Sequence, residues 1–514
     1  MDFIALVIQS FSLLFDPVTL LYVVAGFLIG TVFAAIPGLT ATLALALLLP
    51  LTYSLDITTA LMACASIYMA GMCGGSITAT TINIPGAPSA MMTALEGYPM
   101  QRRGQGALAL GHASLASMIG GGIGATLLIV LAPFIAEASL LVKTAGKFSL
   151  IAFALIVIVI AQRGRVVKAA MAACLGLMLA TIGLDTMVPV ARFTFGMEGL
   201  TAGIALMPVI IGTFAISELL IQAGAVAEHR RLSNEIRQTQ SIRRRDFIPP
   251  LASIRDIGIW CYIKSSLIGY FVGTLPGAGG SMGSFLAYAE AVRTSREPQR
   301  FGNGNPQGIA ASESANNAVC GGALVPMLTF GIPGDPITAI VLGVLIINGI
   351  QPGPQLLADQ ATLIAPMLAS LLFSALILIP VTLFLIGPYF LRIVSIRKDV
   401  LYGSIALLAV VGSYVATYST YQMGLTLLLG TLAYYLRKHD YPVVTLLLGF
   451  ILGPNLEEFL RRTLALSNGN PMVFITNLDS LFFLLLTVFF IYFLAIRKPM
   501  KSDKSPGENN WTTQ

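Results

Sequence analysis

Charged side chains are scarce in this chain. Asp, Glu, Lys and Arg together make up 11% of its 514 residues, whereas hydrophobic residues make up 56%. The mean hydropathy is +0.83, which excludes a soluble domain and indicates a polytopic membrane protein. The apolar segments are long enough for helices and lack the ten-residue alternation of outer-membrane strands. We therefore expect an all-α transmembrane helical bundle embedded in a lipid bilayer.

Residues that usually carry enzyme chemistry are also few. The three histidines are scattered, and no HExxH motif occurs. The five cysteines include no CxxC pair, and we interpret them as free thiols inside helices. No GxxxxGK(S/T) phosphate-binding motif is present, so the sequence offers no nucleotide site. We expect no catalytic residue, no enzyme activity and no bound cofactor other than a coupling ion.

One stretch of the chain occurs twice. Residues 71–90 read GMCGGSITATTINIPGAPSA, and residues 318–338 read AVCGGALVPMLTFGIPGDPIT. Each copy also follows a Pro-Gly pair, at 37–38 and at 276–277, that lies seven residues after a glycine. Chance does not explain this match. The sequence predicts two repeats, expected to be inverted, each with Pro-Gly-broken helices or re-entrant hairpins.

Helix breaks at matching points of two halves are the best sequence indication of a transporter's binding site. Proline and glycine end the helix and leave peptide groups that lipid cannot satisfy. We therefore expect a cavity at the breaks; ordinary packing kinks are the alternative. The residues predicted to bind substrate there are Pro37, Gly38, Thr81, Asn83, Pro85, Gly86, Pro276, Gly277, Gly279, Asn316, Asn317, Thr329, Pro333 and Gly334.

The second copy carries ionisable groups that the first lacks. Aligned on Cys-Gly-Gly, Glu313 corresponds to Ser66, and Asp335 stands where the first copy has Ala87. Ionisable residues at membrane depth are candidates for function, so both are predicted to take part in ion coupling. The alternative is that Glu313 is a solvated residue near the start of its helix, which should begin at Asn305-Pro306.

The positions of the basic residues suggest the domain boundaries and the topology. Residues 1–223 form a first transmembrane half, 224–257 a linker, 258–496 a second half with additional helices, and 497–514 a polar tail. The linker contains seven arginines against four acids, so the positive-inside rule places it in the cytoplasm. Nucleic-acid binding is the competing interpretation of these arginines, and topology explains them without such a partner.

Taken together, these motifs resemble a known family. GYFVGTLPGAGG at 269–280, with the Cys-Gly-Gly and Ile-Pro-Gly-x-Pro elements, is similar to the large membrane subunit of tripartite tricarboxylate transporters over residues 20 to 460. The first copy has Phe33, Leu39 and Thr40 where the second has Gly and Ala-Gly. The resemblance implies a bacterial inner-membrane secondary transporter that imports a carboxylate with sodium. It also implies two partners, a small membrane subunit and a periplasmic solute-binding protein.

The residues themselves are compatible with that mechanism. Helix N-termini at the breaks suit carboxylate oxygens, and unwound carbonyls suit Na⁺, while a proton is the other candidate coupling ion. Two other classes stay open. An ion channel or cation exchanger on a duplicated scaffold would work without a binding protein, and a membrane-embedded enzyme would need a catalytic group that is not evident.

Overall fold

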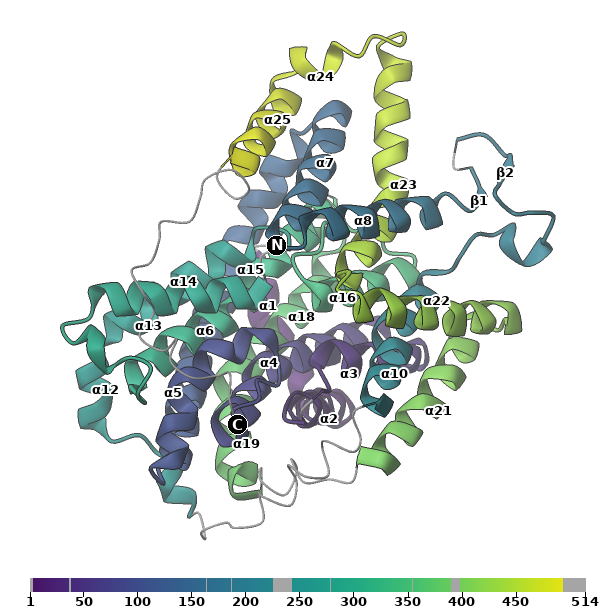
Figure 1. Ribbon diagram of the computed structural model, residues 1–514. Helices are drawn as coiled ribbons and strands as arrows, with labels where there is room; N and C mark the ends of the chain where they lie inside the picture. Colours follow the sequence, from purple (N-terminus) through teal and green to yellow (C-terminus); the bar gives the residue numbers. More distant parts are fainter. Residues whose placement is uncertain are drawn as a thin grey trace.

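The structure is a computed structural model that describes residues 3–36, 38–162, 164–185, 187–224, 243–277, 279–353, 355–389 and 398–492. Within these ranges, seven helices are long and apolar enough to cross a membrane. The one sheet there is a small hairpin, in which β1 (Gly183–Leu184) pairs antiparallel with β2 (Ala191–Arg192). The predicted all-α helical bundle is confirmed (Figure 1).

Helices of the first half run from the N-terminus to the arginine-rich segment. They are α1 (Phe3–Ser10), η1 (Phe11–Phe15), α2 (Pro17–Ala34), α3 (Ala41–Leu48), η2 (Leu49–Ser54), α4 (Ile57–Ile82), η3 (Pro88–Ala90), α5 (Met91–Arg102), α6 (Gly106–Leu140), α7 (Thr144–Ala161), α8 (Val166–Ala180), η4 (Glu198–Leu200), α9 (Leu206–Ile210), the π-helical η5 (Ile211–Ile216) and α10 (Ser217–Gly224). The last three follow one another without a break and make a single span.

The second half begins after the arginine-rich segment. Two short helices, η6 (Arg244–Phe247) and α12 (Leu251–Ile257), lie within that segment, residues 224–257. The helices that follow it are α13 (Ile259–Gly273), α14 (Gly279–Thr294), η7 (Pro298–Arg300), α15 (Pro306–Phe330), α16 (Pro336–Ile347), α17 (Leu356–Asp359), α18 (Ala361–Phe373), η8 (Ser374–Leu378), α19 (Ile379–Ile386), η9 (Gly387–Tyr389), α21 (Lys398–Thr417), α22 (Thr420–Lys438), α23 (Val443–Leu466), α24 (Val473–Thr476) and α25 (Leu478–Phe490).

The predicted Pro-Gly breaks interrupt helices in both halves. Helix α2 ends before the first Pro-Gly pair and α3 begins after it, and α13 and α14 flank the second pair in the same way. At the Ile-Pro-Gly tips, α4 ends at Asn83 and α15 ends at Gly331, both with left-handed backbone at φ values of 58° and 69°. We call residues 84–88 the first tip and residues 332–336 the second tip.

Side-chain caps fix where the two long duplicated helices begin. The backbone N–H of Thr59 donates to the Asp56 carboxylate at 3.0 Å, and that of Gln307 donates to Asn305 Oδ1 at 3.0 Å. Both caps satisfy N–H groups that the first helical turn leaves unpaired. The helix start predicted at Asn305-Pro306 is therefore confirmed, and Asp56 caps α4 in the same way.

Helix α15 lies at the centre of the molecule, packed against α6, α13, α14 and α4. The contact with α6 depends on glycine, because a Cβ on Gly120 would lie 2.1 Å from the carbonyl oxygen of Ser314. One turn further along, a Cβ on Gly124 would lie 2.6 Å from the carbonyl oxygen of Ala318. Small residues let membrane helices approach closely, so the α6 glycines bring α15 and its polar side chains into the interior.

A buried carboxylate on α5 joins the first half to the second. Glu96 is 0% exposed and accepts hydrogen bonds from the backbone N–H groups of Gly302, Gly304 and Asn305 at 2.6 to 2.7 Å. The hydroxyl of Tyr288 is a fourth donor, at 2.7 Å. These bonds hold the loop that precedes α15 against the helix that follows the first tip.

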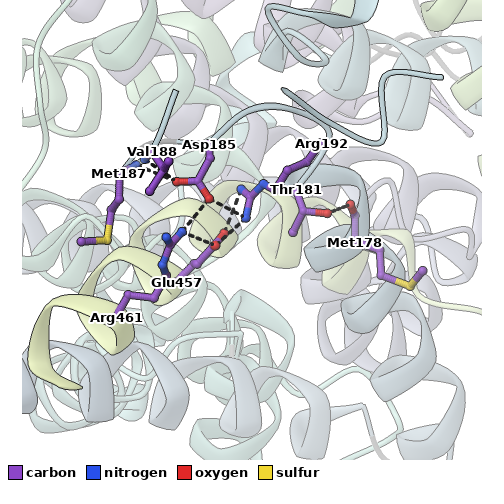
Figure 2. Close-up of polar contacts among 8 residues, drawn as sticks. All are labelled: Met178, Thr181, Asp185, Met187, Val188, Arg192, Glu457 and Arg461. Atoms are coloured by element: carbon purple, nitrogen blue, oxygen red, sulfur yellow. Dashed lines mark hydrogen bonds and ion pairs between the residues drawn. The ribbon is translucent and has the colours of Figure 1, made fainter. Parts of the chain in front are cut away.

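Ion pairs distinguish two opposite ends of the bundle that includes α8 and α23. At one end, Arg165 pairs with Asp440 at 3.0 Å, and Arg437 pairs with Glu218 of α10, the helix that leads into the arginine-rich segment. At the other end, the β1–β2 hairpin projects from the molecule (Figure 1). Asp185 there pairs with Arg192 and with Arg461 of α23 at 3.1 and 2.6 Å (Figure 2). We call these the Arg165 end and the Asp185 end.

Candidate functional site

A group of polar side chains is buried where α15 meets α5 and α6. Glu313, on α15, is 0% exposed and accepts hydrogen bonds from the hydroxyls of Thr93 on α5 and Ser117 on α6, the latter at 3.2 Å. Asn317 donates to Ser117 Oγ at 2.7 Å. None of the ion pairs within the described ranges includes Glu313. The carboxylate is therefore surrounded by neutral groups, which differs from the solvated position considered as the alternative.

Two amide oxygens in this region have no partner. Asn316 and Asn317 are both 0% exposed, and no donor reaches the Oδ1 atom of either within the described residues. The Nδ2 of Asn316 donates to the carbonyl oxygen of Met72 at 2.9 Å, which fixes the orientation of that side chain toward α4. Buried acceptors without donors cost free energy unless a ligand or water supplies the missing contact. The arrangement can therefore accept a cation or a donor group.

The second Pro-Gly break meets the first half at the same place. A Cβ on Gly280, in the first turn of α14, would lie 2.7 Å from Asn316 Oδ1 and 2.9 Å from Ser89 Cβ. Ser89 follows the first tip, and its buried hydroxyl also lacks a partner in the described part of the chain. The N-terminus of α14, the first tip and α15 thus lie together, and a helix N-terminus attracts anions.

Asp335 at the second tip has a different environment. Its Oδ1 accepts the backbone N–H of Thr338 at 2.8 Å and the Thr338 hydroxyl at 2.9 Å, which makes Asp335 the N-cap of α16. Its Oδ2 accepts the hydroxyl of Tyr68 on α4. Asp335 thus has a structural role as a helix cap, whereas the three donors to Glu313 are the side chains of Thr93, Ser117 and Asn317.

Each tip contacts the break of its own half. In the second half, the backbone N–H of Gly277 donates to the carbonyl oxygen of Gly334 at 2.8 Å. In the first half, a Cβ on Gly86 would lie 2.0 Å from the carbonyl oxygen of Ala34, at the end of α2. The peptide groups freed by the breaks are thus in close contact with one another.

Other predicted site residues are spread over a wider region. Thr81 and Thr329 donate to carbonyl oxygens of their own helices at 2.7 and 2.8 Å, and Asn83 is exposed. Gly38 lies against α10, where Gln222 donates to its carbonyl oxygen at 3.1 Å. Pro276, Pro333 and Gly334 are buried, Pro85, Gly277 and Gly279 are partly buried, and Pro37 lies outside the described residues.

Three hydroxyl-bearing residues of this region, Thr93, Ser117 and Tyr68, were not predicted. Thr93, Ser117, Ser89 and Tyr68 are single polar residues within long apolar stretches, and such residues are ordinary in membrane helices. Their only sequence signal is position: Ser89 and Thr93 follow the first tip closely, and Ser117 directly precedes the glycines of α6. Among the described residues, no group of three or more His, Cys, Asp or Glu could hold a metal ion.

Comparison with known proteins identifies the family. Residues 20–448 match the family described as the tripartite tricarboxylate transporter TctA family. The chain belongs to this family. It is also similar to two Agrobacterium vitis proteins. One, described as an uncharacterized 52.8 kDa protein in the TAR-I ttuC' 3'region, is 33% identical over 93% of each chain. The other, described as an uncharacterized protein in the TAR-II ttuC' 3'region, is 37% identical over 41% of this chain and 86% of its own.

The comparison with solved structures gives no significant match. The family assignment makes the chain a multi-pass membrane subunit of a tricarboxylate transporter. It also agrees with the resemblance found in the glycine and proline motifs.

Proposed function

We propose that the chain is the permease subunit of a bacterial inner-membrane importer that moves tricarboxylates or related carboxylates with a cation. The coupling ion is Na⁺ or a proton. A periplasmic solute-binding protein delivers the substrate, and a small membrane subunit completes the complex. The name of the family supports a carboxylate substrate and several components, while the ion and the individual partners belong to this proposal.

The single observation that carries the proposal is the proximity of an anion-attracting helix end to a buried carboxylate that has hydrogen-bond donors but no ion pair among the described residues. The N-terminus of α14 lies beside Asn316 and Ser89, and Glu313 is one helical turn away from Asn316 on α15. A substrate carboxylate at the helix end and a cation at Glu313 would each offset the charge of the other. Without the cation, two like charges about 4 Å apart at an effective dielectric of about 20 repel by about 4 kcal/mol. Binding of the two is therefore coupled.

Uptake into proteoliposomes tests the proposal. The purified chain is reconstituted with candidate small subunit and binding protein, and accumulation of radiolabelled citrate is followed with inward Na⁺, inward proton or no gradient. We expect accumulation only with one of the gradients and only with the binding protein. Equal accumulation without a gradient, or without the binding protein, would contradict the proposed mechanism. Ion currents through the chain alone, with no carboxylate present, would support the channel alternative.

A further inference from the structure

Two cavities open side by side at the Asp185 end. The first has a volume of about 510 Å³ and is lined by Leu184 of the hairpin and by Gly331, which ends α15 before the second tip. The second has a volume of about 420 Å³ and is lined by Phe330. Both cavities are lined by Gln351, Pro352, Asn455 and Glu458. The two cavities therefore adjoin, and we call them together the vestibule, which reaches the end of α15.

The charges that line the vestibule are not balanced. Lys147 at the start of α7 and Arg462 near the end of α23 line it, and Glu458 is the one acidic residue that does so among the residues described. Neither cation has an ion pair among the described residues, and Lys147 lies over the Phe459 ring at 5.9 Å. Arg461, next in the chain, is instead paired with Asp185 and Glu457. The vestibule thus keeps two cations available for a ligand.

We propose that the vestibule is a separate binding site for small di- and tricarboxylates, occupied before the substrate reaches the breaks. This inference rests on the proposed function. Arg462 can bind a carboxylate through two parallel N–H groups, and Lys147 adds a point charge. The side-chain amides of Gln351 and Asn455 can donate to the remaining oxygens. A volume of about 420 Å³ falls in the usual range for small-molecule sites, and a concave positive surface concentrates anions.

Protection from cysteine labelling tests this site without any need for transport. In a background with the five native cysteines replaced, Gln355→Cys places a thiol in the vestibule, and Val190→Cys places one on the exposed hairpin at the same end. Both are treated with a membrane-impermeant maleimide in nanodiscs, with and without citrate. We expect citrate to slow labelling of Gln355→Cys and to leave labelling of Val190→Cys unchanged.

The charges are then changed one at a time in the Gln355→Cys background. Lys147→Gln and Arg462→Gln should each raise the citrate concentration for half-protection roughly tenfold, and Glu458→Gln should lower it. Lys147→Arg keeps the charge and should preserve protection, which separates a ligand contact from a packing role. Phosphate at the same concentration should protect much less than citrate, because only a polycarboxylate reaches both cations and the amides.

Three results would overturn the inference: no citrate protection, protection that survives the double Lys147→Gln/Arg462→Gln change, or equal protection by phosphate. Failure here is distinct from failure of the proposed function. Normal gradient-driven uptake without citrate protection of the cysteine would contradict the vestibule site but support the proposed transport function. Citrate protection of the cysteine without any uptake would support the carboxylate site but contradict the proposed transport mechanism.

Discussion

Tyr68 of the first half donates its hydroxyl proton to Asp335, the residue that caps α16 in the second half. The contact joins helix α4 of one duplicated segment to the tip of the other. It also gives one of the two acidic residues of the second copy a fixed structural partner. Glu313, the other, is held only by hydroxyl and amide groups. Asp335 therefore has a role in the fold, as a helix cap and as a contact between the two halves.

We expect Tyr68→Phe to destabilise the protein by about 1.5 to 3 kcal/mol, because it leaves a buried carboxylate short of a donor. The midpoint of thermal unfolding in detergent should fall accordingly. Tyr262→Phe is the matched control, since Tyr262 is also 0% exposed but its hydroxyl has no partner in the described part of the chain. Equal losses in the two variants would show that the bond to Asp335 contributes no stability.

Glu313→Gln should abolish the dependence of uptake on the cation gradient while the protein still reaches the membrane. The amide has the shape of the carboxylate but carries no charge to attract a cation, so coupled accumulation should fall by roughly tenfold or more. Uptake with and without the gradient measures the effect. Glu297→Gln is the control, because Glu297 is a surface residue paired only with exposed Arg300. An unchanged ion dependence in Glu313→Gln would place the coupling ion elsewhere.

Asn317→Ala should abolish transport with little effect on expression. The change removes an unpartnered buried oxygen and the bond to Ser117, both of which face the proposed ion site. Ala70→Ser, at the matching position of the first copy, should be mild because that position is already apolar. Uptake normalised to the amount of protein in the membrane distinguishes the two. Normal uptake and an unchanged ion dependence in both Asn317→Ala and Glu313→Gln would mean that the site consists of the tip backbones alone.

The helix breaks and caps were predictable because they depend on local chemistry. Helices end at or just before each of the paired Pro-Gly breaks, and Asp56 and Asn305 satisfy N–H groups only two or three residues away. The partners of Glu313 were not predictable, because Thr93 and Ser117 lie about 200 residues away in the sequence. Their contact depends on how closely α6 packs against α15, and thus on backbone approach at glycines such as Gly120.

The contacts of Asp335 were also only partly predictable from the sequence. Its role as a cap is local, because Thr338 stands at the position where a capping box needs a side-chain acceptor. The sequence could have indicated that bond, but an acid at an expected membrane depth pointed to ion coupling instead. The third donor, Tyr68, is 267 residues away. Only the packing of the two halves reveals that the carboxylate is already satisfied.

We expect the Arg165 end to face the cytoplasm and the Asp185 end the periplasm. The arginine-rich segment follows α10, whose Glu218 pairs with Arg437 at the Arg165 end, and short basic loops stay inside. In the cysteine-free background, Val190→Cys should react with an impermeant maleimide in intact cells, and Arg165→Cys should react only after permeabilisation. Ser241→Cys, within the arginine-rich segment, should behave like Arg165→Cys. The reverse pattern would invert the topology and place the vestibule on the cytoplasmic side.

The hairpin at the Asp185 end should stay docked at neutral pH and loosen only in acid. The backbone N–H of Met187, the Arg461 guanidinium and the backbone N–H of Val188 all favour the ionised carboxylate, which lowers the pKa of Asp185 from 3.8 to about 2. A lowered pKa stabilises the docked state above pH 4, and that stabilisation is lost as the pH falls from about 4 toward 2. The rate of hydrogen–deuterium exchange of residues 181–200, corrected for intrinsic rates, should therefore be constant between pH 8 and 5 and should increase below pH 4.

Asp185→Asn separates this effect from other acid titrations. The amide cannot pair with Arg192 and Arg461 as an ion (Figure 2), so the variant should exchange faster already at pH 7. The further increase of its exchange rate below pH 4 should then be smaller than in the unmodified protein. A variant that matches the unmodified protein at pH 7 would show that hairpin docking does not depend on the Asp185 ion pairs. An equal increase of the exchange rate below pH 4 in the variant would show that a different carboxylate causes the pH response. Glu457, which accepts hydrogen bonds from both arginines, is the nearest candidate.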